Sequence, residues 1–553
     1  MGLNKPYSWA KAEFLENQNP FDGPGSTQLR IWIHDMDTQS GRSLFFQLRH
    51  NRRLIFNVLT LNIAYVCFGY DASVIAVCLP MPAFLATFGS VNEAGVPYLT
   101  ASQQSIITAI RTSAGVPGLF ACAYFGTRWG RRNTSWLGCA ATLLGTALQT
   151  GSSTVAMLTV GLTVANFGYF VMVSMAATLS IELAPVPLRG LVGCLSVVGT
   201  GIASVLAAGV GWGTHAYTTS AAYRIPMGIQ MFWPLLQGVL LLWVRDSPTT
   251  YLIKGDDAGA ETSLRHVRHG YTEAEILDEL DLLRQQNRLR MNDESVRWIE
   301  MFQGSNLRRT LLASFLGVIQ QLSGSIFAAA YATVFLAGLH TGSPYALTFG
   351  LYVLVLGGGV VGLGLVTIIS QRTIMLLSFA GLFPIDITVG ALGFVTPPTA
   401  GVSQGIAALL LFFGFYFNMT MGPLTWLNAA ELPTARLRTV TNGFVLLAIS
   451  LSSLLVTYVL PYITNPDEGN LGAKVYVIFA GVMLLGLVVS YLWFPNCKGR
   501  TPAQLDQMFQ ARVPARKFSK WVDVDELDDE KAAQKMDVSE KEHVSIEQSA
   551  VSG

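Results

Sequence analysis

The feature that most constrains this chain is a series of long apolar runs, each close to the length that crosses a bilayer. A helix needs about 20 mostly apolar residues to span roughly 30 Å of hydrocarbon. In lipid, backbone polar groups must be satisfied within the segment itself, which favours helices. The sequence therefore predicts an all-α integral membrane protein with twelve transmembrane helices, near residues 54–79, 101–125, 134–151, 155–181, 190–212, 226–245, 309–337, 346–370, 373–396, 402–428, 439–463 and 474–494.

The composition supports a membrane protein. Only 13% of the 553 residues are charged and 51% are hydrophobic, whereas soluble domains contain about 25% charged residues. We expect membrane lipid as the surrounding partner and no nucleic-acid partner, because the chain has no strongly basic patch. The six cysteines show no framework spacing, which indicates free buried thiols.

Positively charged loops predict the orientation of the chain. Arginine and lysine gather in alternate connections, while the opposite loops 80–100 and 395–401 contain none. Cytoplasmic loops carry this excess of positive charge, so both termini are expected in the cytoplasm, with an even number of spans. We expect a multi-pass protein of the plasma membrane. The positive connections include Arg49, Arg52, Arg53, Arg128, Arg131, Arg132, Arg189, Arg372, Arg436, Arg438, Lys498 and Arg500.

A polar segment and an internal repeat divide the chain into two six-helix pseudo-repeats. Glu182-Leu-Ala-Pro-Val-Pro-Leu-Arg189 follows the fourth span, and Glu431-Leu-Pro-Thr-Ala-Arg-Leu-Arg438 follows the tenth. Repeats of this kind are typical of transporters with alternating access. The predicted parts are a cytoplasmic N-terminal tail, a six-helix bundle, a cytoplasmic central loop, a second six-helix bundle and a cytoplasmic C-terminal tail, at residues 1–50, 51–245, 246–308, 309–495 and 496–553. Within the loop, Thr272 and Glu275 have the spacing of a helix capping box.

Several motifs occur in a fixed order along residues 54–505: Phe68-Gly69-Tyr70-Asp71, Gly126–Arg132, Glu182–Gly190, Tyr223–Gln230, Gln320-Gln321-Leu322-Ser323-Gly324, Gly422-Pro423-Leu424-Thr425-Trp426 and Lys498–Thr501. Together they resemble the sugar-porter family of the major facilitator superfamily, and Gly304–Thr310 with Leu460–Asn465 resemble its fungal maltose and α-glucoside permease branch. The resemblance implies the major facilitator fold. It also implies secondary active transport of a sugar or glycoside, by proton symport with alternating access and without a cofactor.

The resemblance marks Asp71 as the proton-coupling residue. It lies about eighteen residues beyond Arg53, or about 27 Å along a helix. A charged group within the bilayer is costly and usually faces a partner or a cavity. The family's usual partner, an arginine in the fourth span, corresponds here to Leu162. Arg111 lies at a similar depth in the second span, and we hypothesise that it replaces the missing arginine; alternatively, Asp71 stays solvated and Arg111 reaches the outer surface.

The resemblance also suggests substrate-binding and gating residues. Gln320, Gln321, Tyr331 and Trp426 are the substrate-binding candidates; the alternative is that the amides join helices and the tryptophan belongs to a core. The gating candidates are cytoplasmic charges that would pair between the halves in one state: Arg131, Glu182, Arg189, Glu431 and Arg438.

Some positions depart from the family pattern. Val197 and Ile326 stand where the family has glutamine and asparagine, which favours a less polar solute than a simple hexose. Two other functions therefore remain open: a non-transporting nutrient sensor, or an exporter of a secondary metabolite. An enzyme is disfavoured because every histidine lies in a predicted loop or tail, and ATP-driven pumping is disfavoured because no phosphate-binding loop is present. We expect a small solute and protons as ligands, no metal, and no obligate oligomer.

Overall fold

The computed structural model describes residues 52–520, apart from 94, 186–187, 269–270, 293–296, 339–341, 398, 435–436 and 498–501. Contacts divide the chain into two compact units. The described part of the first unit comprises residues 52–58 and 180–192, with most of 246–295. The second unit contains most of the apolar helices, and three of the boundaries, after Val58, Leu179 and Val192, fall within continuous helices.

The first unit has a small core of its own. Three helices build it: α14 (Pro248–Ile253), α15 (Asp257–Val267) and α16 (Glu273–Asn292). Leu264 and Leu280 are among the buried residues that pack between them. The predicted capping box is confirmed, since Thr272 N donates to Glu275 Oε2 at 2.8 Å and Glu275 N donates to Thr272 Oγ1 at 3.3 Å. These contacts give the segment between the apolar helices a defined helical structure.

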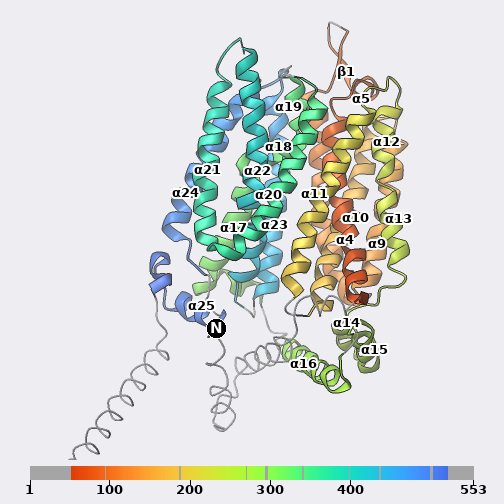
Figure 1. Cartoon of the computed structure of the whole chain (residues 1–553), viewed down its shortest axis with the longest axis vertical. Helices are drawn as coiled ribbons and strands as arrows, with labels where there is room; N and C mark the ends of the chain where they lie inside the picture. Colours follow the sequence, from red (N-terminus) through yellow and green to blue (C-terminus); the bar gives the residue numbers. More distant parts are fainter. Residues whose placement is uncertain are drawn as a thin grey trace, which may run out of the picture. The chain divides into compact units, whose positions relative to one another are not determined.

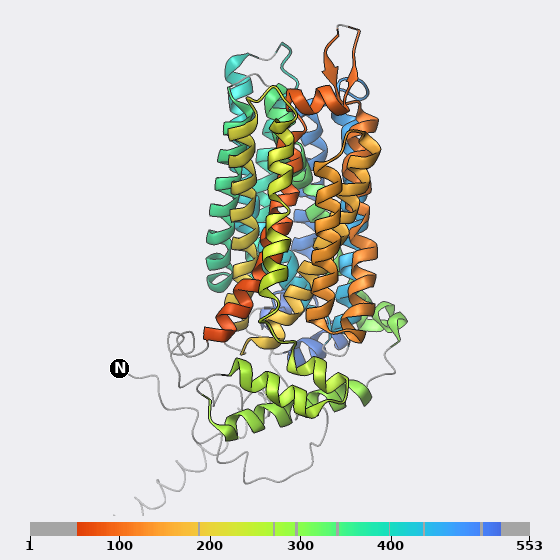
Figure 2. The same cartoon turned by 90° about the vertical axis from the view of Figure 1, so that its right-hand side faces the viewer.

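The helices of the first half of the sequence follow the predicted apolar runs closely. They and the outer hairpin strands are α4 (Arg52–Cys78), α5 (Pro82–Phe88), β1 (Ser90–Val91), β2 (Pro97–Tyr98), α6 (Ala101–Ser105), η1 (Ile106–Ile110), α7 (Arg111–Ser113), α8 (Gly115–Arg128), α9 (Arg131–Thr150), α10 (Val155–Leu183), α11 (Arg189–Thr214), α12 (Ala221–Ile229) and α13 (Phe232–Leu240). The antiparallel β1–β2 pair extends beyond the ends of the membrane helices (Figure 2).

The long helices of the second half gather beside one another (Figure 1). The elements are η3 (Trp298–Phe302), α17 (Gly304–Gln320), η4 (Gln321–Ser325), α18 (Ile326–Ala330), α19 (Ala332–Gly338), α20 (Pro344–Ile368), α21 (Gln371–Leu392), α22 (Ala400–Glu431), α23 (Arg438–Thr464), η5 (Gly472–Val475), α24 (Tyr476–Trp493), α25 (Pro502–Gln510) and η6 (Ala515–Lys520). Pro502–Lys520 is anchored to α17, where Arg309 pairs with Asp506 and donates to the Leu505 carbonyl oxygen at 3.1 Å.

Ten helical segments in the described part of the chain are long and apolar enough to cross a membrane. Two of the twelve predicted spans, 134–151 and 226–245, are not among these ten. In the first region α9 is a single helix, but it buries polar side chains such as Thr142 and Gln149 and is less apolar. The second region is split into α12 and α13, with Pro234 in the first turn of α13. Proline lacks the N–H that would continue a helical ladder.

Glycines allow α9 and α10 to approach closely. A Cβ atom at Gly145 would lie 2.2 Å from the backbone nitrogen of Ala165, and one at Gly168 would lie 2.6 Å from that of Thr142. Small residues are the usual means by which membrane helices pack backbone to backbone. The contact between α9 and α10 therefore depends on the absence of side chains at these positions.

We expect Gly145→Ala to lower the thermal stability of the detergent-purified protein, because the methyl group would push two backbones apart. Overpacking of this kind costs about 1–3 kcal/mol. Gly481→Ala on α24 is the matched control, since a Cβ there meets nothing within 4 Å. Equal melting temperatures for the two variants would show that the α9–α10 contact is looser than described.

Candidate functional site

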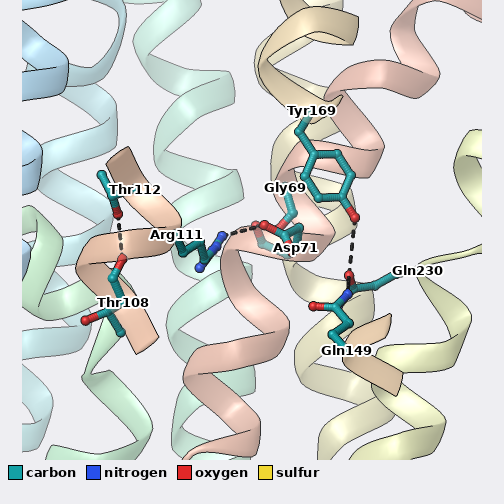
Figure 3. A network of polar contacts seen from close by, with 9 residues as sticks. Gly69, Asp71, Thr108, Arg111, Thr112, Gln149, Tyr169 and Gln230 are labelled. Atoms are coloured by element: carbon teal, nitrogen blue, oxygen red, sulfur yellow. Dashed lines mark hydrogen bonds and ion pairs between the residues drawn. The ribbon is translucent and has the colours of Figure 1, made fainter. Parts of the chain in front are cut away.

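A buried ion pair joins α4 to α7. Asp71 is 0% exposed, and its Oδ2 atom lies 2.5 Å from Nη2 of Arg111, whose side chain is 14% exposed. Leu162, at the position where the family has arginine, is fully buried on α10. The structure thus contains the contact that the sequence hypothesis named (Figure 3). A role for the pair in proton coupling remains a prediction.

A π-helical turn sets the direction of Arg111. The turn η1 ends at Ile110, and Arg111 follows it directly. The extra residue of a π-turn rotates the following helix relative to a regular one, and such turns often occur at functional sites. Thr108 in this turn donates through Oγ1 to the Gln104 carbonyl at 2.7 Å, and Thr112 donates to the Thr108 carbonyl at 2.9 Å. Sequence reasoning missed this turn, because it is a backbone feature without a composition signal.

Buried amides and a tyrosine form a second polar group near Asp71. Tyr169 on α10 donates through its hydroxyl to Gln230 Oε1 at 3.2 Å, and Gln149 on α9 donates to the same atom at 2.5 Å. All three side chains are almost completely buried. Tyr169 lies near Asp71 (Figure 3). Gln230 belongs to the motif Tyr223–Gln230, whereas no sequence signal indicated Gln149 or Tyr169.

Hydrogen bonds join the two halves of the sequence at the helix ends remote from the arginine-rich connections. We call this group the outer contacts. Tyr331 is its central residue: its hydroxyl lies 3.0 Å from Thr108 Oγ1 and donates to the Thr457 carbonyl at 3.4 Å. The group contains three more hydrogen bonds, each of 2.8 Å: Ser105 Oγ donates to the Tyr458 carbonyl, Ala101 N donates to Asp467 Oδ2, and Asn465 Nδ2 donates to Gln104 Oε1.

Tyr331 was predicted as a substrate-binding residue on the family resemblance. Its side chain is 4% exposed, and its hydroxyl is occupied by Thr108 and Thr457. In this conformation Tyr331 therefore links the two halves at their outer ends. Contact with a solute would require the outer contacts to open.

The predicted glutamines lie where the seventh span breaks. Helix α17 ends at Gln320, and the π-helical segment η4 starts at Gln321. Gly324 within it has a φ of 84°, which favours glycine. The Gln320 carbonyl accepts bonds from Ser323 and Ser325 at 2.6 and 3.0 Å. Both glutamine side chains are half-buried beside this interrupted helix, and their substrate-binding role remains a prediction.

The remaining predicted residues are placed only in part. Trp426 lies in α22, but its side chain is outside the described residues. The same holds for the side chains of Arg189, Glu431 and Arg438, which stand at the start of α11, the end of α22 and the start of α23. Arg131 is 8% exposed and donates to the Gly126 carbonyl at 3.2 Å, and Glu182 is half-buried near the end of α10. The gating roles of these residues remain predictions.

Cysteine placement agrees with the sequence interpretation. Cys67, Cys78, Cys122 and Cys139 are free thiols and buried, and Cys497 is also buried. The side chain of Cys194 is outside the described residues. Sequence reasoning missed one buried acid, Asp386 in α21, which is 0% exposed. An aspartate within the apolar run 373–396 is a visible signal in the sequence.

Comparisons with known proteins agree with this architecture. The family model described as "Sugar (and other) transporter" matches residues 58–509. The chain is 28% identical over 499 residues to the MFS transporter fmqE of Aspergillus fumigatus, covering 85% of this chain and 89% of that protein. It is 25% identical over 514 residues to the general alpha-glucoside permease of Saccharomyces cerevisiae, covering 90% of this chain and 83% of the permease.

Solved structures show the same fold. The inward-open xylose transporter XylE from E. coli superposes with a TM-score of 0.67 and 17% identity, covering 82% of this chain and 99% of XylE. Its fold is that of the major facilitator superfamily. Since the family model spans most of the sequence and the fold agrees, the chain is a multi-pass membrane protein that belongs to the sugar (and other) transporter family of the major facilitator superfamily.

Proposed function

We propose that this protein is a proton-coupled secondary transporter that carries a sugar or glycoside across the membrane by alternating access. One observation supports the coupling most strongly. Thr108, whose hydroxyl contacts Tyr331, lies within the π-helical turn η1. Arg111, which forms the ion pair with Asp71, follows three residues later, directly after the same turn. A change in the charge of Asp71 would therefore act on the element that closes the outer contacts.

The coupling step follows from simple electrostatics. A proton on Asp71 removes its negative charge, so the attraction for Arg111 falls to that of an ordinary hydrogen bond. Arg111 can then turn away, and Thr108 moves with it because both belong to one turn. The hydrogen bond between Thr108 and Tyr331 would weaken, and the outer contacts would open. Once the outer side has closed around the solute, release of the proton to the cytoplasmic side would restore the ion pair and keep the outer contacts closed.

The polar groups suit a ligand with hydroxyl groups. Gln320 and Gln321 offer amide donors and acceptors next to the break in the seventh span. An aromatic face from Trp426 would suit a sugar ring. Val197 and Ile326 remove two polar side chains relative to the family, so a glycoside with an apolar part fits better than a simple hexose. The similarity to an alpha-glucoside permease supports the same class of solute.

The cell-level proposals follow from family and charge. We infer a carrier rather than an enzyme, residing in the plasma membrane with both termini in the cytoplasm. Its ligands would be one small solute and protons, without an obligate partner chain. The charges at Arg131, Glu182, Arg189, Glu431 and Arg438 would pair between the halves when the cytoplasmic side closes.

Uptake by yeast that lacks its own hexose and maltose transporters tests the proposed function. A panel of sugars and glycosides would be supplied with and without a protonophore. We expect saturable uptake of at least one α-glycoside and its loss when the proton gradient is removed. Saturable binding to the purified protein without flux into vesicles would instead indicate a nutrient sensor. Net efflux of a preloaded apolar metabolite, without sugar uptake, would indicate an exporter.

Removal of the Tyr331 hydroxyl should favour opening at the outer side. Tyr331→Phe loses the hydroxyl that contacts Thr108 and Thr457 but keeps the ring, and loss of one hydrogen bond shifts the equilibrium by about 1 kcal/mol. We expect faster labelling of a cysteine placed at Gln104 by an impermeant thiol reagent. Tyr416→Phe is the control, because that hydroxyl binds the Leu377 carbonyl within the second half. Equal labelling of the two variants would argue against a closing role for Tyr331.

A further inference from the structure

A second acidic residue, Asp386 in α21, is buried without a compensating group. Its side chain is 0% exposed. Neither Oδ1 nor Oδ2 has a hydrogen-bond partner among the residues that the structure describes. An ionised carboxylate in such surroundings would cost several kcal/mol, and usually such a group becomes neutral instead. Asp386 is therefore best described in this conformation as a carboxylic acid that holds a proton.

The hydroxyl of Tyr476 is the natural partner of that acid. Tyr476 begins α24, is fully buried, and its hydroxyl also lacks a partner within the described part of the chain. The Tyr476 hydroxyl lies close enough to Asp386 for their charges to interact. Its ring is fixed edge-on by Phe327, Phe413 and Phe479, with centroid distances of 5.5, 6.2 and 5.4 Å. A hydroxyl and a carboxylic acid can each donate to the other.

The other titratable or charged side chains near α21 are placed differently. Tyr416 on α22 donates to the Leu377 carbonyl at 2.7 Å, and Lys474 on η5 lies 5.3 Å from the centre of the Phe394 ring. Tyr352 on α20 donates to the Ala329 carbonyl at 3.0 Å. The helices that pack against α21 also contain Tyr345 on α20, Tyr491 on α24 and Glu431 at the end of α22. Arg372 lies in the first turn of α21 itself. Within the described residues, no cation forms an ion pair with Asp386.

We propose that Asp386 is a second proton-binding site, located in the second half of the molecule, which keeps its proton while the outer contacts are closed. The step is a simple acid dissociation: the O–H bond of Asp386 breaks, the electron pair stays on the carboxylate, and water accepts the proton. No bond to the solute forms, so the site changes the charge of the carrier by one.

A chain of contacts links this site to the outer contacts. Phe327, which covers Tyr476, lies on α18, and the same short helix leads directly into Tyr331. Both flanking elements can bend: α18 follows the break at Gly324, and Pro384 interrupts the hydrogen-bond ladder of α21 just before Asp386. Opening of the Tyr331 contact would therefore draw Phe327 off Tyr476 and let Asp386 take up its proton from outer water. Closure would then hold that proton until water on the cytoplasmic side accepts it.

Infrared spectroscopy of the purified protein tests the site without any transport assay. At neutral pH we expect wild-type protein to show the carbonyl band of a protonated carboxylic acid. Asp386→Asn should lose that band, and Tyr476→Phe should shift its frequency, because the dipole of the neighbouring hydroxyl is removed. Asp71→Asn is the matched control and should keep it. A band unchanged by Asp386→Asn would overturn the proposed proton site.

Flux measurements test the coupling, which alone rests on the proposed transport function. In proteoliposomes, Asp386→Asn should retain solute exchange but move fewer protons per solute than wild type. An unchanged number of protons per solute, together with loss of the infrared band, would overturn a transported proton at Asp386. If wild-type protein shows the Asp386 band but moves no solute, the transport proposal fails while the proton site is supported.

Discussion

Asp71→Asn is expected to abolish proton-driven accumulation of the solute while leaving exchange of labelled for unlabelled solute intact. Asparagine keeps an oxygen that can accept from Arg111, but it cannot take up a proton. The carrier should therefore still change conformation with solute bound, yet a pH gradient would no longer drive it. Accumulation and exchange, measured in the same proteoliposomes, would separate the two activities.

The control for this prediction is an acid far more exposed to solvent. Asp281 on α16 is 65% exposed and pairs with Arg284 at 2.8 Å, and surface pairs contribute little. Asp281→Asn should accumulate solute as well as wild type does. If Asp71→Asn also accumulates solute against its gradient, Asp71 is not the coupling residue.

Arg111→Leu is expected to destabilise the protein strongly, because it leaves Asp71 without its cation. Breaking a buried ion pair by removing one partner costs about 3–5 kcal/mol. The double variant Asp71→Asn with Arg111→Leu should regain much of that loss, since no unpaired charge remains. Melting temperatures of the wild type, both single variants and the double variant form a complete thermodynamic cycle.

Additive losses in this cycle would contradict the ion pair, because they would mean that the two residues act independently. A proton-coupled uptake unchanged by Arg111→Leu would argue against its functional role. The two readouts address different claims: the cycle tests the contact of 2.5 Å between the side chains, and uptake tests its use in coupling.

The long helices could be predicted from the sequence because lipid demands continuous apolar runs. The boundary between 346–370 and 373–396 was the hardest to set, and the structure ends α20 at Ile368 and starts α21 at Gln371. The breaks within two of these helices could not be predicted from the apolar runs. The sixth predicted span is divided at residues 230–231, and the seventh is divided after Gln320. Each depends on local backbone geometry, which hydropathy does not report.

The candidate site was accessible to sequence reasoning only in part. Counting residues along helices placed Asp71 and Arg111 at similar depths, and the structure has them in contact. The partner of Tyr331 could not be predicted, since Thr108 is 223 residues away in sequence and meets it only through packing of the two halves. Asp386 could have been noticed as an acid in an apolar run, but its neighbour Tyr476 follows from packing of α21 against α24.

Simultaneous measurement of solute and proton entry into sealed proteoliposomes that contain only this protein tests the central claim most directly. With an inward proton gradient and an α-glucoside outside, the proposal predicts solute accumulation above the external concentration. It also predicts acidification of the lumen that depends on the solute and is lost in Asp71→Asn. Saturable binding of the same solute with neither entry nor acidification would contradict the account.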